Sequence, residues 1–465
     1  MKDTSNHRSA AADAPWQEPR MLRWLGLVLF CAIVAFAAWW RWQIRAPAIS
    51  SDEIALVKPP GRCEIGFFSN IEWARNSPLF PLLFACIPDL SVALQLGRDA
   101  ATLCGFAAIV AVFIAARRAT GGDNLSGALA AAIVAFDPVL AYESVTFRPY
   151  GIWALVESWR LACLFGLLAE ASDTARPRLW KTFVVLTCLM PWTHYASFVI
   201  LAFEGILFAI LLPGKRWLLK AHAIAAATAL PLIAFVVYMR NSPDSTGGAF
   251  DRALAIVFAR HFGVAGWPWV VGLFVLALFL SRPLAPRAAL IHWLAVGAAA
   301  LLLSATTLVR PAVAALGVPA FAVVVPAVIS LYFGKARYLG LAAAALLVFT
   351  NWPFAPLRQR DYGPARESPD IAAFAADLRR ETVRGDWSVF PDWDLTVLNF
   401  VLETSGSHVE SWGPDMLEVG PIRLHPIRDR TRLPAGRVVL FSCDDQLVGC
   451  TPTGGRPCAK TYECP

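Results

Sequence analysis

The sequence predicts a polytopic α-helical membrane protein that ends in a small α/β domain. Three observations lead to this fold class. Of the 465 residues, 57% are hydrophobic and only 16% are charged, and the mean hydropathy is +0.53. Apolar runs long enough to cross about 30 Å of hydrocarbon recur from residue 21 to residue 353. The segment 354–465, in contrast, is polar.

The chain begins with a polar stretch, 1–20, which we expect to be a tail on the cytoplasmic side. The apolar run that follows starts after Met21 and is bounded by Arg23 and Arg41. It lacks the small-residue cleavage site of a secretory signal peptide, so we predict that it stays in the protein as the first transmembrane helix.

The apolar runs between residues 21 and 353 predict about eleven transmembrane helices, which together form the membrane domain. The predicted spans are 22–42, 98–117, 124–141, 151–170, 181–194, 196–213, 220–239, 266–281, 288–309, 312–333 and 337–353.

Positive charge predicts the orientation of these helices. If the N-terminus is cytoplasmic, every short loop on that side contains at least two Lys or Arg residues, as the positive-inside rule requires. The segment 354–465 then lies on the opposite, outer side. The basic loop residues are Arg117, Arg118, Arg176, Arg178, Lys181, Lys215, Arg216, Lys220, Arg282, Arg287, Lys335 and Arg337.

Two regions are predicted to lie outside the membrane. The first external loop, about 44–97, is long, and its second half from Leu79 to Leu96 is apolar but contains two prolines and Asp89. We expect that half to lie along the membrane interface. The segment 354–465 is predicted to be an α/β domain, with strands at 387–390 and 437–441. Its helix is indicated by apolar residues at helical spacing, namely Ile371, Phe374, Ala375 and Leu378.

Four of the ten cysteines lie close together at the C-terminal end of the chain. They lack the close pairs of a zinc site, so disulfides are the preferred interpretation and a bound metal is the alternative. Cys63 is left over, either as a free thiol or as a competing partner. The disulfide candidates are Cys443, Cys450, Cys458 and Cys464.

The candidate catalytic residues are Asp52 and Glu53, two adjacent carboxylates just after the first span. One could act as a general base that takes a proton from an acceptor hydroxyl. The other would then hydrogen-bond the acceptor or a neighbouring cation. The alternative is that both are ordinary solvated carboxylates of a loop.

Arg148 and Tyr150 open a later span, and Glu143 precedes them by a few residues. A guanidinium at the membrane surface suits a phosphate group, because its planar fork can bind two phosphate oxygens. The alternative is an arginine that anchors the helix end at the lipid headgroups while the tyrosine sits in the aromatic belt.

His194 and Tyr195 lie at the mouth of another span, and Arg310 ends a span on the predicted outer side. The histidine could hydrogen-bond a phosphate or a sugar hydroxyl; the alternative is a histidine satisfied by a backbone carbonyl. No second histidine lies at metal-ligand spacing, so a divalent metal is not supported. Within the spans, Glu157 and Arg160 can neutralise each other, whereas Glu204 lacks a partner in its own helix.

The order of these motifs resembles the GT-C superfamily of polyprenyl-phosphate-sugar glycosyltransferases, in particular its bacterial family-39-like members. The residues that carry the resemblance are Ser51-Asp52-Glu53-Ile54-Ala55, Asn76-Ser77-Pro78-Leu79-Phe80, Asp137-Pro138 with Tyr142-Glu143 and Arg148-Pro149-Tyr150-Gly151, and Thr193-His194-Tyr195. The C-terminal domain is similar to the family's outer α/β domain. The cluster of cysteines and the segment around Arg310 depart from the family pattern.

The resemblance implies an inverting sugar transfer, of a hexose or a pentose, from a polyprenyl-phosphate donor to a glycolipid, polysaccharide or protein acceptor. Asp52 would deprotonate the acceptor and Glu53 would position it. Arg148, with His194 and Arg310, would stabilise the departing phosphate, and Glu143, Tyr150 and Tyr195 would line the donor site. The resemblance also implies a bacterial inner membrane, with the C-terminal domain in the periplasm and no nucleic-acid partner.

Two other functions remain open from the sequence. A non-enzymatic transporter or flippase of lipid-linked glycans would explain the spans and the basic residues at their outer ends. A membrane scaffold would explain the cysteine-rich C-terminal domain.

Overall fold

The computed structural model describes part of the chain, which divides into two compact units. The first unit is Met1–Trp42, Ala101–Ser144 and Pro149–Pro353, and the second is Gln43–Ala100, Val145–Arg148 and Phe354–Pro465. The described residues are 19–44, 53, 79–84, 87, 89–169, 176–240, 284–305, 316–332, 337–351, 368–378, 380, 385–390, 398, 402, 411–413, 416–419, 421–427, 435–441, 446–447, 449–456 and 459–465.

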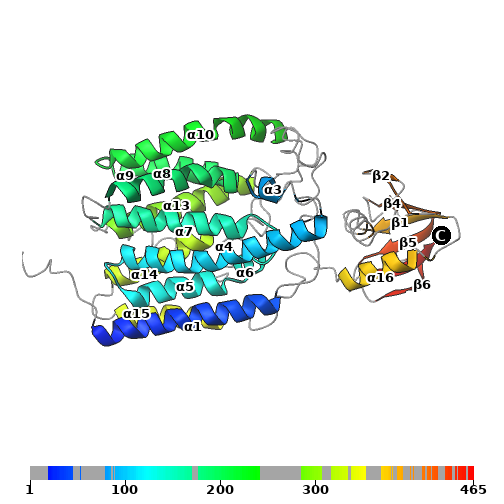
Figure 1. Ribbon diagram of the computed structural model, residues 1–465, viewed down its shortest axis with the longest axis horizontal. Coiled ribbons are helices and arrows are strands. Elements are labelled where there is room, and N and C mark those ends of the chain that lie inside the picture. Colours follow the sequence, from blue (N-terminus) through cyan, green and yellow to red (C-terminus); the bar gives the residue numbers. More distant parts are fainter. Residues whose placement is uncertain are drawn as a thin grey trace, which may run out of the picture. The chain divides into compact units, whose positions relative to one another are not determined.

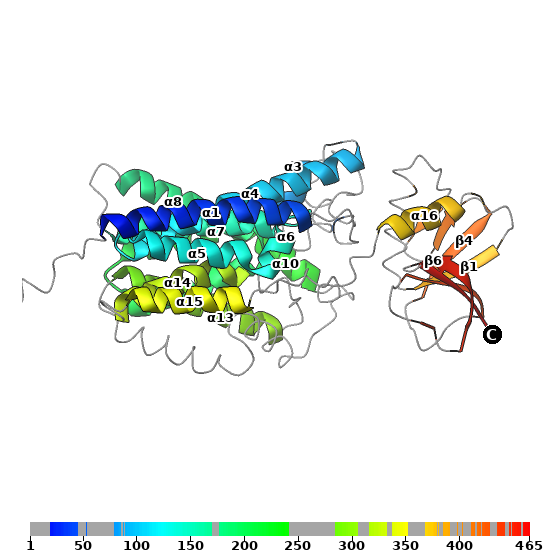
Figure 2. The same ribbon diagram turned by 90° about the horizontal axis from the view of Figure 1, so that it is seen from below.

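The first unit is a helical bundle, in which the helices lie side by side with their axes close to parallel (Figures 1 and 2). Neighbouring pairs include α7 with α8, α9 with α13 and α5 with α14. The end of α1 after Trp42 and the start of α4 before Ala101 belong to the second unit. The helices of the bundle are α1 (Arg20–Ile44), α4 (Leu90–Ala119), α5 (Asn124–Phe136), α6 (Pro138–Glu143), α7 (Tyr150–Leu168), α8 (Arg176–Thr193), α9 (Ala196–Leu211), α10 (Arg216–Arg240), α13 (Leu284–Ala305), α14 (Val318–Tyr332) and α15 (Arg337–Asn351).

The polytopic helical fold predicted from the sequence is confirmed. Each predicted span coincides with a helix, except 266–281, which lies outside the described residues, and 124–141, which is two helices. Among the described residues, three helical stretches are both long and apolar enough to cross a membrane: Arg20–Trp42, Ser91–Ala119 and Tyr150–Leu168. The other apolar helices are shorter, for example Ala196–Leu211.

The span predicted at 124–141 is interrupted at Asp137. This residue ends α5, and its carboxylate accepts a hydrogen bond of 2.8 Å from the backbone N–H of Leu140, so that it also caps the start of α6. Pro138 follows at the first position of α6, where its missing N–H costs nothing. A continuous helix was therefore the wrong prediction, because the Asp-Pro pair both ends one helix and starts the next.

The predicted start of the second span also differs from the structure, in the apolar second half of the first loop. It contains a short helix, α3 (Leu79–Phe84), and residues 90–96 form the first turns of α4, which begins at Leu90 instead of residue 98. Asp89 caps this helix by accepting hydrogen bonds from the Ser91 hydroxyl and from the backbone N–H groups of Ser91 and Val92. These bonds lower the pKa of the Asp89 carboxyl, with the Ser91 hydroxyl as the largest cause.

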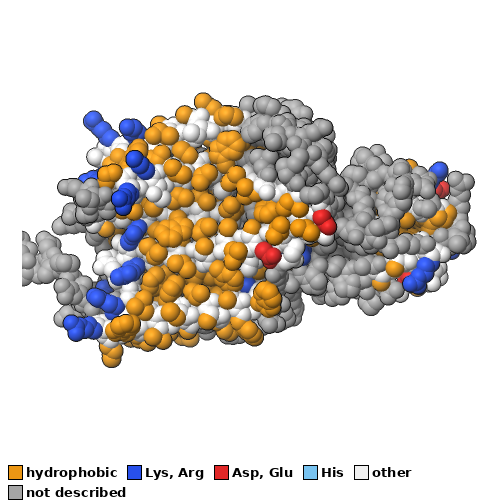
Figure 3. Space-filling view, in the orientation of Figure 1, with side chains coloured by type: hydrophobic (Ala, Val, Ile, Leu, Met, Phe, Trp, Pro, Cys, Tyr) orange, Lys and Arg blue, Asp and Glu red, His pale blue; other side chains and the backbone are white. Residues whose placement is uncertain are grey.

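Lys and Arg side chains gather at one end of the helical bundle, next to a broad hydrophobic surface (Figure 3). Arg117, Arg176, Arg178 and Lys220 are exposed near the ends of their helices. A hydrophobic belt bounded by basic residues at one end is the arrangement that the positive-inside rule associates with a membrane domain.

The C-terminal part of the second unit is a seven-stranded sheet with helix α16 (Ser368–Leu378) packed against it. The strand order is β2-β3-β4-β1-β5-β7-β6, and β1 pairs in parallel with both β4 and β5. On α16, Phe374 packs edge-to-face on Phe441 at 5.4 Å between ring centroids. The strands are β1 (Gly385–Phe390), β2 (Ser411–Gly413), β3 (Met416–Val419), β4 (Ile422–Pro426), β5 (Gly436–Leu440), β6 (Thr451–Arg456) and β7 (Ala459–Cys464).

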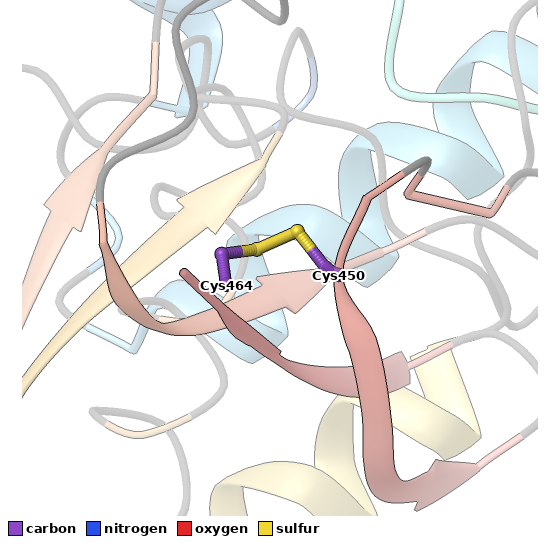
Figure 4. The surroundings of a disulfide bond; sticks show 2 residues. All are labelled: Cys450 and Cys464. Atoms are coloured by element: carbon purple, nitrogen blue, oxygen red, sulfur yellow. A yellow bond between two sulfur atoms is a disulfide. The ribbon is translucent and has the colours of Figure 1, made fainter.

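A disulfide joins Cys450 to Cys464 at one end of the β6–β7 hairpin (Figure 4). The antiparallel register pairs Thr451 with Glu463, so the next pair of positions along the two strands places these cysteines side by side. The sulfur atoms join the buried core beside Leu440 and Tyr462. The other two disulfide candidates, Cys443 and Cys458, lie outside the described residues.

Gly151, in the second position of α7, allows α7 and α4 to touch through their backbones. A Cβ at this position would overlap the carbonyl oxygen of Ala101. We expect Gly151→Ala to lower the free energy of unfolding by about 1–3 kcal/mol, because the backbone of α4 would have to move.

The matched control is Gly297→Ala in α13, where a Cβ would meet no atom within 4 Å. That change should raise the free energy of unfolding by about 0.5–1 kcal/mol, since it only removes backbone freedom from the unfolded chain. Unfolding of the purified variants, followed by tryptophan fluorescence, would test both. Equal stability of the two variants would contradict the close approach of the α7 and α4 backbones at Gly151.

Candidate functional site

Glu53, the second carboxylate of the predicted catalytic pair, is buried and forms an ion pair. Both carboxylate oxygens accept hydrogen bonds of 2.8 Å from the Arg98 guanidinium, and the side chain of Glu53 is 1% exposed. The backbone N–H of Phe147 donates a third bond of 2.7 Å to the same carboxylate. The sequence left open whether this carboxylate would hydrogen-bond the acceptor or a neighbouring cation. In the structure it bonds to a neighbouring cation, Arg98.

Phe147 is fixed on its other side by packing. Its ring lies edge-to-face on Phe84 of α3 at 5.2 Å, and it fills the space that a side chain at Gly97 of α4 would need. One buried carboxylate therefore ties three separate segments together: the first loop, the start of α4 and the residues just before α7.

We expect Glu53→Gln to lower the free energy of unfolding by about 3 kcal/mol, because it removes one charge of a buried, bidentate ion pair with Arg98. The double variant Glu53→Gln/Arg98→Gln should lose less than the two single variants added together, since it removes both charges. Thermal unfolding in detergent, without a chemical denaturant, would measure this coupling. Strictly additive losses would show that the two charges do not depend on each other.

Asp52, the other candidate catalytic residue, lies outside the described residues, as does Arg310. Arg148 is described and is half-buried, directly after Phe147. Its backbone N–H donates to the carbonyl oxygen of Thr146 at 2.7 Å, which forms a tight turn just before α7. The Glu53 carboxylate thus orders the backbone of the residue that precedes Arg148.

In the first unit, Tyr150 and His194 come together. Tyr150 is the first residue of α7, and its ring lies 5.4 Å from the imidazole of His194 in the two-residue break between α8 and α9. One turn further along α7, the indole N–H of Trp153 donates to the hydroxyl of Ser197 on α9 at 2.8 Å. These two contacts hold the break between α8 and α9 against the start of α7.

The hydrogen bonding of His194 determines which ring nitrogen carries the proton. Nδ1 accepts a bond of 3.1 Å from the backbone N–H of Ala196, so the proton of the neutral ring is on Nε2. Nε2 is buried and has no hydrogen-bond partner among the described residues. The expected alternative, a histidine satisfied by a backbone carbonyl, is not what these residues form. The ring instead offers an unused N–H donor in a buried position.

The remaining candidates of the first unit are Glu143 and Tyr195. Glu143 is the last residue of α6 and is 2% exposed. Tyr195 is half-buried beside His194, and burial raises the pKa of its phenol, which keeps the group protonated and able to donate. Among the described residues, no group of three or more His, Cys, Asp or Glu side chains is arranged so that it could hold a metal ion.

Four buried ionisable residues and one partly buried histidine form a second polar site in the interior of the bundle. Arg160 bonds to Glu157 on its own helix, as the sequence predicts, and also to Glu204 on α9 at 2.8 Å. Glu204 lacks a partner only within its own helix, because His222 on α10 and His292 on α13 contact it as well. We call Glu157, Arg160, Glu204, His222 and His292 the intramembrane cluster.

The sequence did not single out Arg98, Phe147, His222 or His292. Arg98 gives a usable signal, since it is a basic residue at the predicted outer end of a span, where the positive-inside rule predicts few. A backbone N–H such as that of Phe147 gives none. The histidines are isolated in their own helices, and only the packing of α9 with α10 and α13 brings them to one carboxylate.

The two units together define a class of protein: a polytopic helical membrane domain joined to a small α/β domain. No family model and no curated protein matches the sequence. Solved structures do match. ArnT from Cupriavidus metallidurans in the apo state has 13% identity and a TM-score of 0.55, over 94% of this chain and 97% of ArnT. The same protein bound to undecaprenyl phosphate has 14% identity and a TM-score of 0.52, with the same coverage.

ArnT is a glycosyltransferase of the GT-C family. The likeness shows that this chain has the fold of ArnT, and it agrees with the resemblance found in the sequence motifs.

Proposed function

We propose that the protein is an integral-membrane glycosyltransferase, which transfers a sugar with inversion from a polyprenyl-phosphate donor to an acceptor outside the cytoplasm. The single observation that carries the proposal is the likeness to ArnT over 94% of this chain, in a structure that holds undecaprenyl phosphate. The order of the sequence motifs supports the same reaction. The acceptor is a glycolipid, a polysaccharide or a protein, and the sugar is a hexose or a pentose.

In this proposal Asp52 is the general base. It takes the proton of the acceptor hydroxyl, while the hydroxyl oxygen attacks the anomeric carbon from the side opposite the phosphate. The bond from that carbon to the phosphate oxygen breaks, and polyprenyl phosphate leaves. Glu53 supports the assignment, because its carboxylate is engaged with Arg98 and Phe147 and so serves to position the loop. That leaves the adjacent Asp52 for proton transfer.

The proposal assigns stabilisation of the departing phosphate to Arg148, His194 and Arg310. The buried, unused Nε2–H of His194 supports this role, because such a donor can bond to a phosphate oxygen without first losing another partner. Tyr150, which packs on the imidazole, keeps it oriented. Glu143 and Tyr195 are assigned to the sugar or its phosphate.

The proposed location is a bacterial inner membrane, with a cytoplasmic N-terminus and a periplasmic α/β domain. The gathering of Lys and Arg at one end of the bundle supports this orientation. The Cys450–Cys464 disulfide supports an oxidising compartment for the C-terminal domain.

Binding of the lipid product tests the donor assignment. Undecaprenyl phosphate should raise the unfolding temperature of the purified protein, and undecaprenol, which lacks the phosphate, should not. His194→Phe keeps a ring against Tyr150 but removes the donor, so it should weaken binding of the phosphate about tenfold or more. The control His425→Gln changes an exposed histidine in β4 and should bind normally. An equal response to both lipids would overturn the phosphate site.

A transporter of lipid-linked glycans is the second candidate. The intramembrane cluster is the observation that favours it, since buried ionisable residues often mark ion or substrate pathways in membrane proteins. A transporter would move the lipid between leaflets without breaking the sugar–phosphate bond. Release of free polyprenyl phosphate therefore separates the two functions.

A further inference from the structure

The intramembrane cluster contains more negative than positive charge if its histidines are neutral. Glu157 and Glu204 each carry one negative charge, and Arg160 carries one positive charge. All three side chains are 0% exposed. A net charge of this kind is very costly to bury in a membrane protein, so one further proton is needed to neutralise the cluster.

Arg160 is the centre of the cluster. Its Nε donates to Glu157 at 2.7 Å, and its Nη1 donates to Glu204 at 2.8 Å. Its guanidinium also lies 5.9 Å from the ring of Phe183 on α8. One guanidinium thus divides its donors between two carboxylates on two helices. Its single positive charge balances only one of their two negative charges, so a second cation beside them would be favourable.

The contacts of His292 show where a second positive charge fits. Its Nε2 contacts Glu157, and its Nδ1 lies 3.0 Å from a carboxylate oxygen of Glu204. An ionised carboxylate only accepts hydrogen bonds, so both contacts are favourable together when a proton lies between each pair of atoms. Nδ1 is also 3.2 Å from Nη2 of Arg160, which can donate to it when the ring is neutral. The ring therefore has a partner in either protonation state.

His222 offers the same proton a second position. Its Nδ1 lies 2.8 Å from the carbonyl oxygen of Leu218, which fixes a proton on that nitrogen. Its Nε2 lies 3.0 Å from the other carboxylate oxygen of Glu204 and again needs a proton in between. Among the five side chains His222 is the most exposed, at 9%. It lies in the second turn of α10, near the basic loop that precedes this helix.

We propose that the intramembrane cluster is a proton-binding site, which holds one exchangeable proton on Glu204 and the two histidines beside it. A single proton makes the whole cluster neutral: two carboxylates are balanced by Arg160 and by one added positive charge. Among the described residues, the charged and titratable side chains that contact one another at this site come from α7, α9, α10 and α13, and α8 places the ring of Phe183 against Arg160. The described part of α14, which packs on α13, contributes none.

The proposal explains why four helices converge on one carboxylate. Glu204 joins α9 to α7 through Arg160, to α10 through His222 and to α13 through His292. Each of the last two contacts is attractive when a proton lies between its two atoms, so loss of the bound proton should weaken the hold of Glu204 on α10 or α13. This site does not depend on the transferase proposal, because it involves none of the residues assigned to sugar transfer.

Two spectroscopic measurements on the full-length protein in lipid nanodiscs test the site. Nitrogen-15 NMR of labelled histidine detects imidazolium, and infrared spectroscopy detects a protonated carboxylic acid. At pH 8, where histidine in water is neutral, the wild type should show one equivalent of imidazolium or one buried carboxylic acid. Glu204→Gln removes one negative charge, so that the charges of Glu157 and Arg160 balance each other without an added proton. This variant should therefore lose the imidazolium or carboxylic-acid signal that the wild type shows.

Three further variants complete the experiment. His425→Gln removes an exposed histidine of the C-terminal domain and should leave the signal unchanged. His292→Gln and His222→Gln identify the histidine that carries the proton. Absence of both signals from the wild type at pH 8, or their survival in Glu204→Gln, would overturn the proposal. Neither outcome bears on sugar transfer, which is measured separately.

Discussion

Replacing Asp52 by Asn is expected to reduce the rate of sugar transfer by at least about 100-fold. A general base contributes roughly 10²–10⁴ to the rate of such a reaction, and the carboxamide has nearly the same shape but cannot take up a proton. The loss should fall on kcat, because the acceptor and the donor still bind. The measurement is the transfer of labelled sugar by the purified variant at saturating donor.

The Asp52→Asn protein must also be shown to be folded. It should respond to undecaprenyl phosphate with the same rise in unfolding temperature as the wild type, since the base contributes nothing to binding of the phosphate. Glu53→Gln gives the contrast, because its main effect should be on stability. If Asp52→Asn retained full activity, the base would have to be another residue.

Replacing Arg160 by Gln is expected to have the largest effect on stability, about 3–5 kcal/mol. Removal of one partner from a buried ion pair leaves an uncompensated charge, and here Glu157 and Glu204 would both lose their guanidinium. The histidines can recover part of this loss by binding additional protons. The destabilisation should therefore become smaller as the pH is lowered. Unfolding temperatures measured between pH 8 and pH 5 would show this.

The matched control is Arg178→Gln on α8, an exposed arginine at the basic end of the bundle. Loss of an exposed charge should change stability by less than about 0.5 kcal/mol, without dependence on pH. An Arg160→Gln protein as stable as this control would show that the cluster does not hold the helices together.

Much of the fold could be predicted because it depends on local composition. Apolar runs gave the spans, and a Pro-Asp start signal with apolar residues at helical spacing gave α16. The interruption at Asp137 was missed, since the residues on both sides are equally apolar. The early start of α4 was missed because Asp89 was interpreted as a break in a loop, whereas it caps a helix.

The candidate site could be predicted only in part, since its contacts join distant segments. Glu53 stood out, but its partner Arg98 is 45 residues away and was recognised only as the start of a span. The contact of Glu204 with His292 crosses 88 residues. No local pattern specifies which face of α13 meets α9. Chemistry that depends on tertiary packing therefore becomes visible only in the folded chain.

Sugar transfer is tested with purified wild-type protein in nanodiscs and a set of undecaprenyl-phosphate-linked pentoses and hexoses, labelled in the sugar. Incubation with a periplasmic glycan and lipid extract should release one undecaprenyl phosphate for each labelled sugar that reaches an acceptor. Asp52→Asn should release none above background. If labelled lipid instead crossed the membrane of a proteoliposome with its sugar still attached, the protein would be a transporter and the account of the reaction would be wrong.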